Sequence, residues 1–127
     1  MIIAVDFDGT IVQHRYPLIG RERPFAIDTL RKLQREGHIL ILWTIRRGQR
    51  LDEAVEYCLS RGLQFNAVNC NYGDMDEDSR PGKIYADIYI DDRNLGGIPD
   101  WTSIYNIITG KSAQIHSSRL ARLFSRK

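Results

Sequence analysis

The sequence predicts an α/β fold, in which one domain of 127 residues is built on a parallel β-sheet with helices on both of its faces. Four short, mainly apolar runs lie at residues 2–5, 38–44, 65–68 and 86–90. Continuous apolarity is typical of strands that are buried on both faces. Segments with helical spacing separate most of these runs, and this alternation favours right-handed crossovers between parallel strands.

Three segments carry the apolar spacing of amphipathic helices. The first follows Pro24 and ends at Gly37, the second begins near Leu51 and ends at Gly62, and the third follows Pro99. Proline is favoured in the first turn of a helix, and glycine is favoured just beyond its last turn. The positions of proline and glycine therefore agree with the helix ends that the hydrophobic periodicity predicts.

The composition restricts the classes of partner. The net charge is only +2, which gives no argument for nucleic acid, and no apolar run is long enough to span a membrane. Cys58 and Cys70 lack the spacing of metal ligands, so we expect reduced thiols. The N-terminus shows no signal-peptide pattern, and we expect a cytoplasmic protein.

Polar residues with side-chain oxygens lie at the carboxyl ends of three of the predicted strands. Asp6 and Asp8 follow the first strand, Thr44 ends the second, and Asp91 and Asp92 follow the fourth. In a parallel sheet, ligands bind beyond the carboxyl ends of the strands. Two carboxylates about 4 Å apart at a half-buried site repel by on the order of 4 kcal/mol, so a cation between them is expected.

The order of these residues resembles the haloacid dehalogenase superfamily, whose members are mostly phosphatases. The resemblance rests on D-x-D-G-T at residues 6–10, the strand-end Thr44, Lys83 ahead of the fourth strand, and the pair Asp91-Asp92. It implies a Rossmann-like sheet with the first strand at its centre. It also implies hydrolysis of a phosphate monoester through an aspartyl-phosphate intermediate.

The resemblance assigns catalytic roles to four residues. Asp6 is the expected nucleophile, because a carboxylate that is ionised at neutral pH needs no base to activate it. Asp8 would protonate the departing oxygen and then activate the hydrolytic water, and we expect crowding by Asp6 and Asp91 to help it hold a proton. Thr44 would hydrogen-bond a phosphate oxygen, and Lys83 would neutralise the nucleophile and the phosphate together.

The cofactor that the resemblance implies is Mg²⁺. Its expected ligands are the Asp6 carboxylate, the backbone carbonyl of Asp8 and the Asp91 carboxylate. Magnesium prefers oxygen ligands and keeps several of its waters. Asp92 is expected to hold Lys83 or a metal-bound water without contacting the ion.

Five residues are predicted to bind the substrate phosphate: Gly9, Thr10, Thr44, Arg46 and Lys83. The glycine would let the backbone approach the phosphate, and its amide would donate a hydrogen bond to it. Arg46 lies two residues beyond the strand-end threonine, and a guanidinium group pairs well with phosphate oxygens.

No stretch between the motifs has room for a cap domain, because only 13 residues separate Thr10 from Pro24. An open site needs either a large substrate or a second subunit to cover it, so a homo-oligomer is one expectation. The acidic stretch 74–82 is expected to be a solvated loop beside the site. The basic segment 111–127 is expected to be a tail or a helix that packs Leu120, Leu123 and Phe124 on its own domain or on a second copy.

Two alternatives to a phosphatase stay open. A phosphotransferase of the same fold would pass the phosphoryl group to an acceptor other than water. A non-enzymatic module would bind Mg²⁺ or phosphate for regulation. The presence of both Asp6 and Asp8 favours an enzyme, because a binding module needs no proton shuttle. The expected partner is a phosphorylated substrate, whose identity the sequence does not name.

Overall fold

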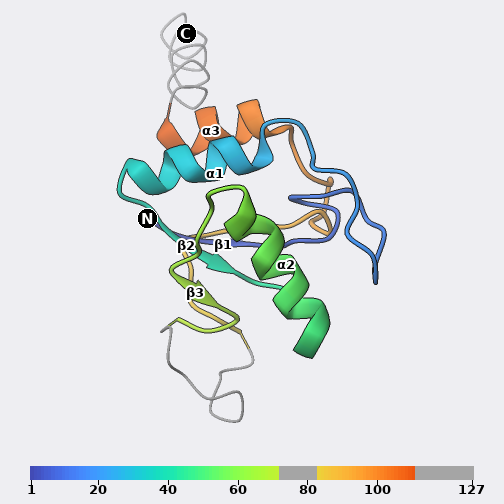
Figure 1. Ribbon diagram of the computed structural model, residues 1–127. Helices are drawn as coiled ribbons and strands as arrows, with labels where there is room; N and C mark the ends of the chain where they lie inside the picture. The colour runs from blue at the N-terminus through green and yellow to red at the C-terminus, as the bar shows by residue number, and fades with distance from the viewer. Residues whose placement is uncertain (72–82, 111–127) are drawn as a thin grey trace, which may run out of the picture.

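The computed structural model describes residues 1–71 and 83–110. Strands and helices alternate along the chain for most of its length, as the sequence predicts (Figure 1). The elements are β1 (Ile2–Val5), α1 (Ala26–Arg35), β2 (Ile39–Leu42), α2 (Gly48–Ser60), β3 (Ala67–Val68), β4 (Ile88–Ile90) and α3 (Trp101–Thr109).

The four strands form one parallel sheet in the order β3-β2-β1-β4. The first strand of the sequence therefore lies inside the sheet, between β2 and β4. Val5 pairs with Leu42 on one side and with Ile90 on the other, so the carboxyl ends of the three strands are level. The α/β class and the parallel sheet are confirmed, and the residues that follow these strands meet at one edge.

The strands are shorter than the apolar runs that predict them. The run 38–44 forms a strand only from Ile39 to Leu42. The amide of Trp43 still donates to the Val5 carbonyl, at 2.8 Å, but the amide of Thr44 donates to the side chain of Asn69. The chain thus leaves the sheet at the point where polar side chains begin.

All three described helices pack on the same face of the sheet. One hydrophobic core joins Val5 and Leu42 to Leu30 of α1, Cys58 of α2 and Ile104 of α3. Helices α1 and α3 lie side by side over this face (Figure 1). The prediction of helices on both faces is therefore wrong for the part of the chain that the structure describes.

The opposite face has a smaller core without a described helix. Ala4, Ile41 and Ala67 of the sheet pack there against Cys70 and Ile84, which come from the chain between β3 and β4. Among residues 1–71 and 83–110, none of the helices packs on this face.

Both cysteines are buried. Burial raises the pKa of the Cys58 thiol to about 12, so this thiol is unreactive at neutral pH. Within the described residues, none of the helices has the length and apolarity needed to cross a membrane. The acidic stretch expected at 74–82 and the tail expected at 111–127 lie outside the described residues.

Candidate functional site

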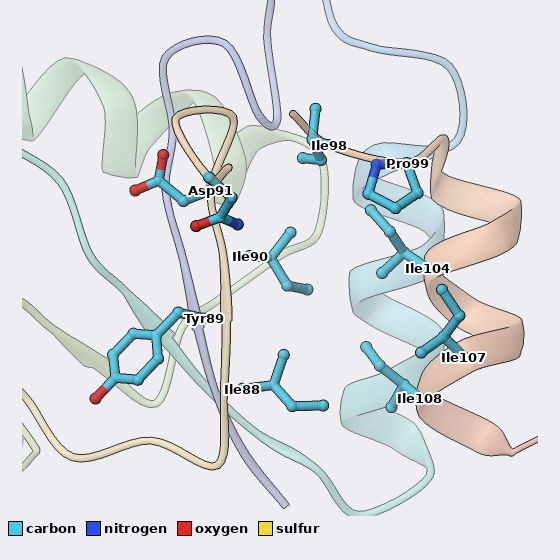
Figure 2. A pocket seen from close by; sticks show the side chains of 10 residues that line it. Ile88, Tyr89, Ile90, Asp91, Ile98, Pro99, Ile104, Ile107 and Ile108 are labelled. Carbon is cyan, nitrogen blue, oxygen red and sulfur yellow. The ribbon is translucent and has the colours of Figure 1, made fainter. Parts of the chain in front are cut away.

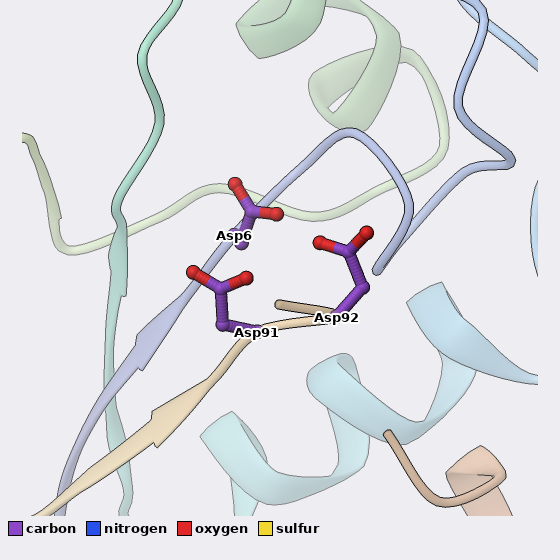
Figure 3. Close-up of side chains that lie close together, drawn as sticks. All are labelled: Asp6, Asp91 and Asp92. Carbon is purple, nitrogen blue, oxygen red and sulfur yellow. The ribbon is translucent and has the colours of Figure 1, made fainter. Parts of the chain in front are cut away.

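The first and fourth strands bring three carboxylates together at the carboxyl edge of the sheet. Asp6 follows β1, and its amide donates to the carbonyl of Ile90, the last residue of β4, at 2.9 Å. Asp91 and Asp92 follow β4 directly. Figure 3 shows the three side chains facing a common space, and one oxygen of each lies within 4.8 Å of the others. We call Asp6, Asp91 and Asp92 the acidic cluster.

The acidic cluster carries more negative charge than its own surroundings neutralise. Burial, together with the charge of Asp91 and the hydrogen bond and charge of Asp92, raises the pKa of Asp6 to about 8. Oδ1 of Asp92 is buried and has no hydrogen-bond partner within the described residues. A cation between these carboxylates would therefore favour the ionised form of Asp6.

Thr10 connects two members of the acidic cluster. Its hydroxyl donates to Oδ2 of Asp6 at 3.2 Å and accepts the amide of Asp92 at 3.0 Å. Its carbonyl accepts the indole N–H of Trp101 at 3.0 Å, and the residue is fully buried. The hydroxyl hydrogen is therefore committed to Asp6, which corrects the prediction that Thr10 binds substrate phosphate.

Gly9 serves the site by being small. Its amide donates to the carbonyl of Val12 at 2.7 Å, so the predicted hydrogen bond from this amide to phosphate is not available. Its φ is +82°, and a Cβ at this position would lie 2.2 Å from Oδ2 of Asp92. Only glycine lets the loop after β1 approach the acidic cluster this closely.

Asp8 points into a different environment from Asp6. Nε and Nη2 of Arg46 donate to its two oxygens, each at 2.7 Å. Such a two-point pair is among the strongest charge-assisted arrangements in proteins. The neighbour of Asp8 is thus a buried cation, whereas the sequence analysis expects crowding by Asp6 and Asp91.

Arg46 has no donor left for a ligand. Nη1 donates to the carbonyls of Pro17 and Arg50, each at 3.3 Å, and Nη2 also donates to the carbonyl of Leu18 at 3.0 Å. With the two bonds to Asp8, all five N–H groups of the guanidinium are used. The side chain is 0% exposed. The prediction that Arg46 binds substrate phosphate is wrong for this structure.

Thr44 lies at the same edge, in a buried position beyond β2. Its hydroxyl oxygen accepts the amide of Arg46 at 3.1 Å, and its own amide donates to Oδ1 of Asn69 at 2.8 Å. Within residues 1–71 and 83–110 its hydroxyl hydrogen has no acceptor. Among the side chains at the strand ends that are predicted to bind phosphate, Thr44 is therefore the one whose hydroxyl hydrogen is not donated to another described residue.

Asn69 is a site residue to which the sequence analysis assigns no role. It follows β3, is buried, and has a φ of 54°, which is rare for a residue other than glycine. Its Oδ1 holds the Thr44 amide, while its Nδ2 is buried and has no partner in the described part of the chain. A polar residue directly after a two-residue apolar strand is the signal that indicates it.

Lys83 is not brought to the acidic cluster. The side chain is exposed, and its Nζ lies 4.8 Å from the ring centroid of Tyr89. Figure 2 shows Tyr89 and Asp91 on the same side of β4.

The donors of the acidic cluster fit a hard cation such as Mg²⁺. These donors are all carboxylate oxygens, which magnesium prefers, and neither histidine nor cysteine belongs to the cluster. No Lys or Arg in the described residues forms an ion pair with these carboxylates. The unpartnered Oδ1 of Asp92 means that Asp92 can serve as a ligand beside Asp6 and Asp91, in addition to the predicted role of holding a bound water.

A cavity of about 140 Å³ lies between β4 and α3, next to the strand end that carries Asp91. Figure 2 shows Ile88 and Ile90 facing Ile104, Ile107 and Ile108 across it. These walls are apolar, and the polar residues Asp91 and Asn94 also line the cavity.

Comparison with known proteins finds a relative of known structure. No family profile matches the chain, and no curated protein matches it significantly. A solved structure, that of a conserved protein coded by a locus of Bacteroides thetaiotaomicron, is 58% identical in sequence, with a TM-score of 0.82. The match covers 87% of this chain and 91% of that chain. The chain therefore belongs to the same family as this conserved Bacteroides protein.

Proposed function

We propose that this protein is a Mg²⁺-dependent phosphohydrolase that acts on a phosphate monoester, with Asp6 as the nucleophile. One observation carries the proposal. Asp6 stands at the end of the interior strand, is bonded through Thr10 to the chain of Asp92, and faces Asp91 and Asp92 with no described cation to neutralise them. Three neighbouring carboxylates without a cation repel one another and would destabilise a purely structural site. The same arrangement suits a nucleophile that works with a bound metal ion.

The first half of the reaction would be phosphoryl transfer to Asp6. A carboxylate oxygen of Asp6 attacks phosphorus as the bond from phosphorus to the leaving oxygen breaks. If the leaving oxygen departs as an alcohol, it would take a proton that Asp8 carries at the start of this step, which leaves Asp8 as the carboxylate that Arg46 holds. Magnesium bound by the acidic cluster would supply positive charge that keeps Asp6 ionised and offsets the charge of the phosphoryl oxygens.

The second half would release phosphate from Asp6. Asp8 accepts a proton from a water molecule, whose oxygen attacks phosphorus while the bond from phosphorus to Asp6 breaks. Inorganic phosphate leaves, and both carboxylates return to their starting states. Thr44 would offer a hydroxyl donor to a phosphoryl oxygen, and Lys83, whose Nζ lies 4.8 Å from the Tyr89 ring centroid, would supply positive charge to the phosphate.

A regulatory module that binds Mg²⁺ without turnover is the second candidate. It is favoured by the commitment of the Gly9 amide, the Thr10 hydroxyl and the Arg46 guanidinium to partners inside the protein. A site with few free donors holds a phosphate group weakly. Metal binding without product formation is the behaviour expected of this candidate.

The test is a phosphate-ester panel with and without Mg²⁺, in which inorganic phosphate and the released alcohol are both measured. We expect equal amounts of both products in water and no release without Mg²⁺. The Asp6→Asn variant should lose on the order of 10³-fold or more of the rate. Asp52→Asn, at an exposed position of α2, makes the same chemical change away from the site and should keep the wild-type rate.

Three results would redirect the proposal. Alcohol in excess of phosphate when an acceptor is added indicates a phosphotransferase. Calorimetric Mg²⁺ binding with no release from any ester indicates the regulatory module. An Asp6→Asn variant that keeps more than a tenth of the wild-type rate would remove Asp6 from the role of nucleophile.

A further inference from the structure

Arg46 joins the first turn of α2 to two stretches of the chain that lie about 30 to 40 residues earlier. Its guanidinium bonds Asp8 in the loop after β1, the carbonyls of Pro17 and Leu18, and the carbonyl of Arg50 in the first turn of α2. The aromatic rings of Phe7 and Tyr16 add contacts, with centroids 5.2 and 5.1 Å from Cζ. A side chain with this many fixed partners holds one geometry.

Residues 13–20 form a short exposed segment between β1 and α1, which we call the flap. Its base is closed by the amide of Gln13, which donates to the Arg21 carbonyl at 2.7 Å, and by an antiparallel bridge between Val12 and Glu22. Beyond this base, the side-chain hydrogen bonds that reach the flap from the rest of the described chain come from Arg46. The same guanidinium therefore fixes the flap and Asp8 to each other.

We propose that Arg46 is a positioning residue, which holds the Asp8 carboxylate and the flap in one fixed arrangement beside the acidic cluster without contacting substrate. The proposal rests on the proposed function for the part that concerns Asp8 as proton donor. Arginine suits the task because its planar fork reaches both oxygens of a carboxylate and further carbonyls at once. A lysine ammonium is a single point charge and cannot span the same set of partners.

The consequence for catalysis is selective. Without Arg46, the Asp8 side chain loses both of the bonds that aim it, so proton donation to the leaving oxygen should suffer most. General acid catalysis contributes on the order of 100-fold or more when the leaving group is poor. A good leaving group such as p-nitrophenolate needs no proton, so its departure should be much less affected.

The test compares Arg46→Met, Arg46→Lys and the control Arg50→Met on p-nitrophenyl phosphate and on an alkyl phosphate such as glycerol 2-phosphate. Arg50 has an exposed side chain paired with Glu53, and only its backbone contacts Arg46. For Arg46→Met we expect kcat/KM on the alkyl ester, which reports the steps up to release of the alcohol and not the later hydrolysis of phosphorylated Asp6, to fall by on the order of 100-fold. For kcat/KM on the aryl ester we expect a fall of about threefold, and for Arg50→Met no change on either ester.

Arg46→Lys keeps the buried positive charge and carries the test if Arg46→Met does not fold. It should show the same preference for the aryl ester to a smaller degree. Equal losses of kcat/KM on the two esters for a folded Arg46 variant would mean that Arg46 does not position Asp8 for proton donation, and the proposal would be overturned. Full activity of Arg46→Lys on both esters would overturn it as well.

A second measurement does not depend on activity. Amide hydrogen exchange of flap residues 13–20 should be at least tenfold faster in Arg46→Lys than in the wild-type protein or in Arg50→Met. If the wild-type protein hydrolyses no ester, the proposed function fails, and exchange alone decides whether Arg46 holds the flap. Unchanged exchange in the Arg46 variants would overturn the positioning role whatever the outcome of the activity panel.

Discussion

At the scale of single residues, two carboxylates only two positions apart have opposite surroundings. Asp6 shares its space with Asp91 and Asp92, and its pKa is raised to about 8. Asp8 instead meets the buried guanidinium of Arg46 at 2.7 Å. The two carboxylates therefore differ in the charge of the partner that each one faces.

The role of Gly9 leads to a prediction at this scale. Gly9→Ala should lower the free energy of unfolding by about 3 kcal/mol and weaken Mg²⁺ binding, because the new methyl group would collide with the Asp92 carboxylate. Chemical denaturation and calorimetry measure the two effects. Gly37→Ala is a matched control, since Gly37 also has a positive φ, of +97°, but has no atom within 4 Å of a Cβ.

The control should cost about 1–2 kcal/mol for its backbone alone and leave Mg²⁺ affinity unchanged. Equal losses in the two variants would mean that the approach of Asp92 to Gly9 contributes nothing.

At the scale of elements, helix α3 supports the site from behind. Asp100 caps the helix by accepting the Ser103 amide at 2.8 Å, which fixes where the helix begins. The next residue, Trp101, is 1% exposed and donates its indole N–H to the Thr10 carbonyl. The position of the D-x-D-G-T loop therefore depends on a helix that lies 91 residues later in the chain.

A substitution at Trp101 tests this support. Trp101→Phe should lower the free energy of unfolding by about 1–3 kcal/mol, because the buried carbonyl of Thr10 loses its donor. The loss of ester hydrolysis should exceed that of Trp43→Phe, because Trp43 packs on the opposite face of the sheet. Thermal unfolding and kcat on the same ester measure both effects. Similar activity losses in the two variants would show that the Trp101 hydrogen bond does not position the loop.

At the scale of the whole molecule, the acidic cluster couples stability to pH and to metal. Folding raises the pKa of Asp6 to about 8 from the model-peptide value of 3.8, so between these values the folded protein holds a proton that the unfolded chain releases. In this window the unfolded state binds fewer protons. The stability of the metal-free protein therefore falls as pH rises from about 4 to 8, and it is highest at the acidic end of the window.

The corresponding prediction concerns the melting temperature in a chelator. Between pH 5.5 and pH 8, the wild-type protein should lose on the order of 5 °C, whereas Asp6→Asn should lose much less, because its side chain does not titrate. Millimolar Mg²⁺ should restore the wild-type protein at pH 8 far more than at pH 5.5, since binding displaces the Asp6 proton. A melting temperature that rises with pH in the wild-type protein alone would contradict the assignment.

The periodicity of the sequence determined most of the fold. Continuous apolar runs locate β1 at its observed bounds and the other strands within a few residues, and their order along the chain predicts a parallel sheet. Because parallel strands end at one edge, the meeting of Asp6 with Asp91 also followed from the sequence. These features depend on local burial and chain direction, which a linear pattern records.

Only the tertiary structure decided which partner each polar side chain takes. Thr10 and Arg46 are residue types that bind phosphate, yet the structure gives their donors to Asp6 and to Asp8 with the flap carbonyls. The packing of all described helices on one face is likewise decided by long-range contacts, because an amphipathic helix reads the same on either face. A donor bonds whichever acceptor folding brings within about 3 Å, and the sequence does not record that distance.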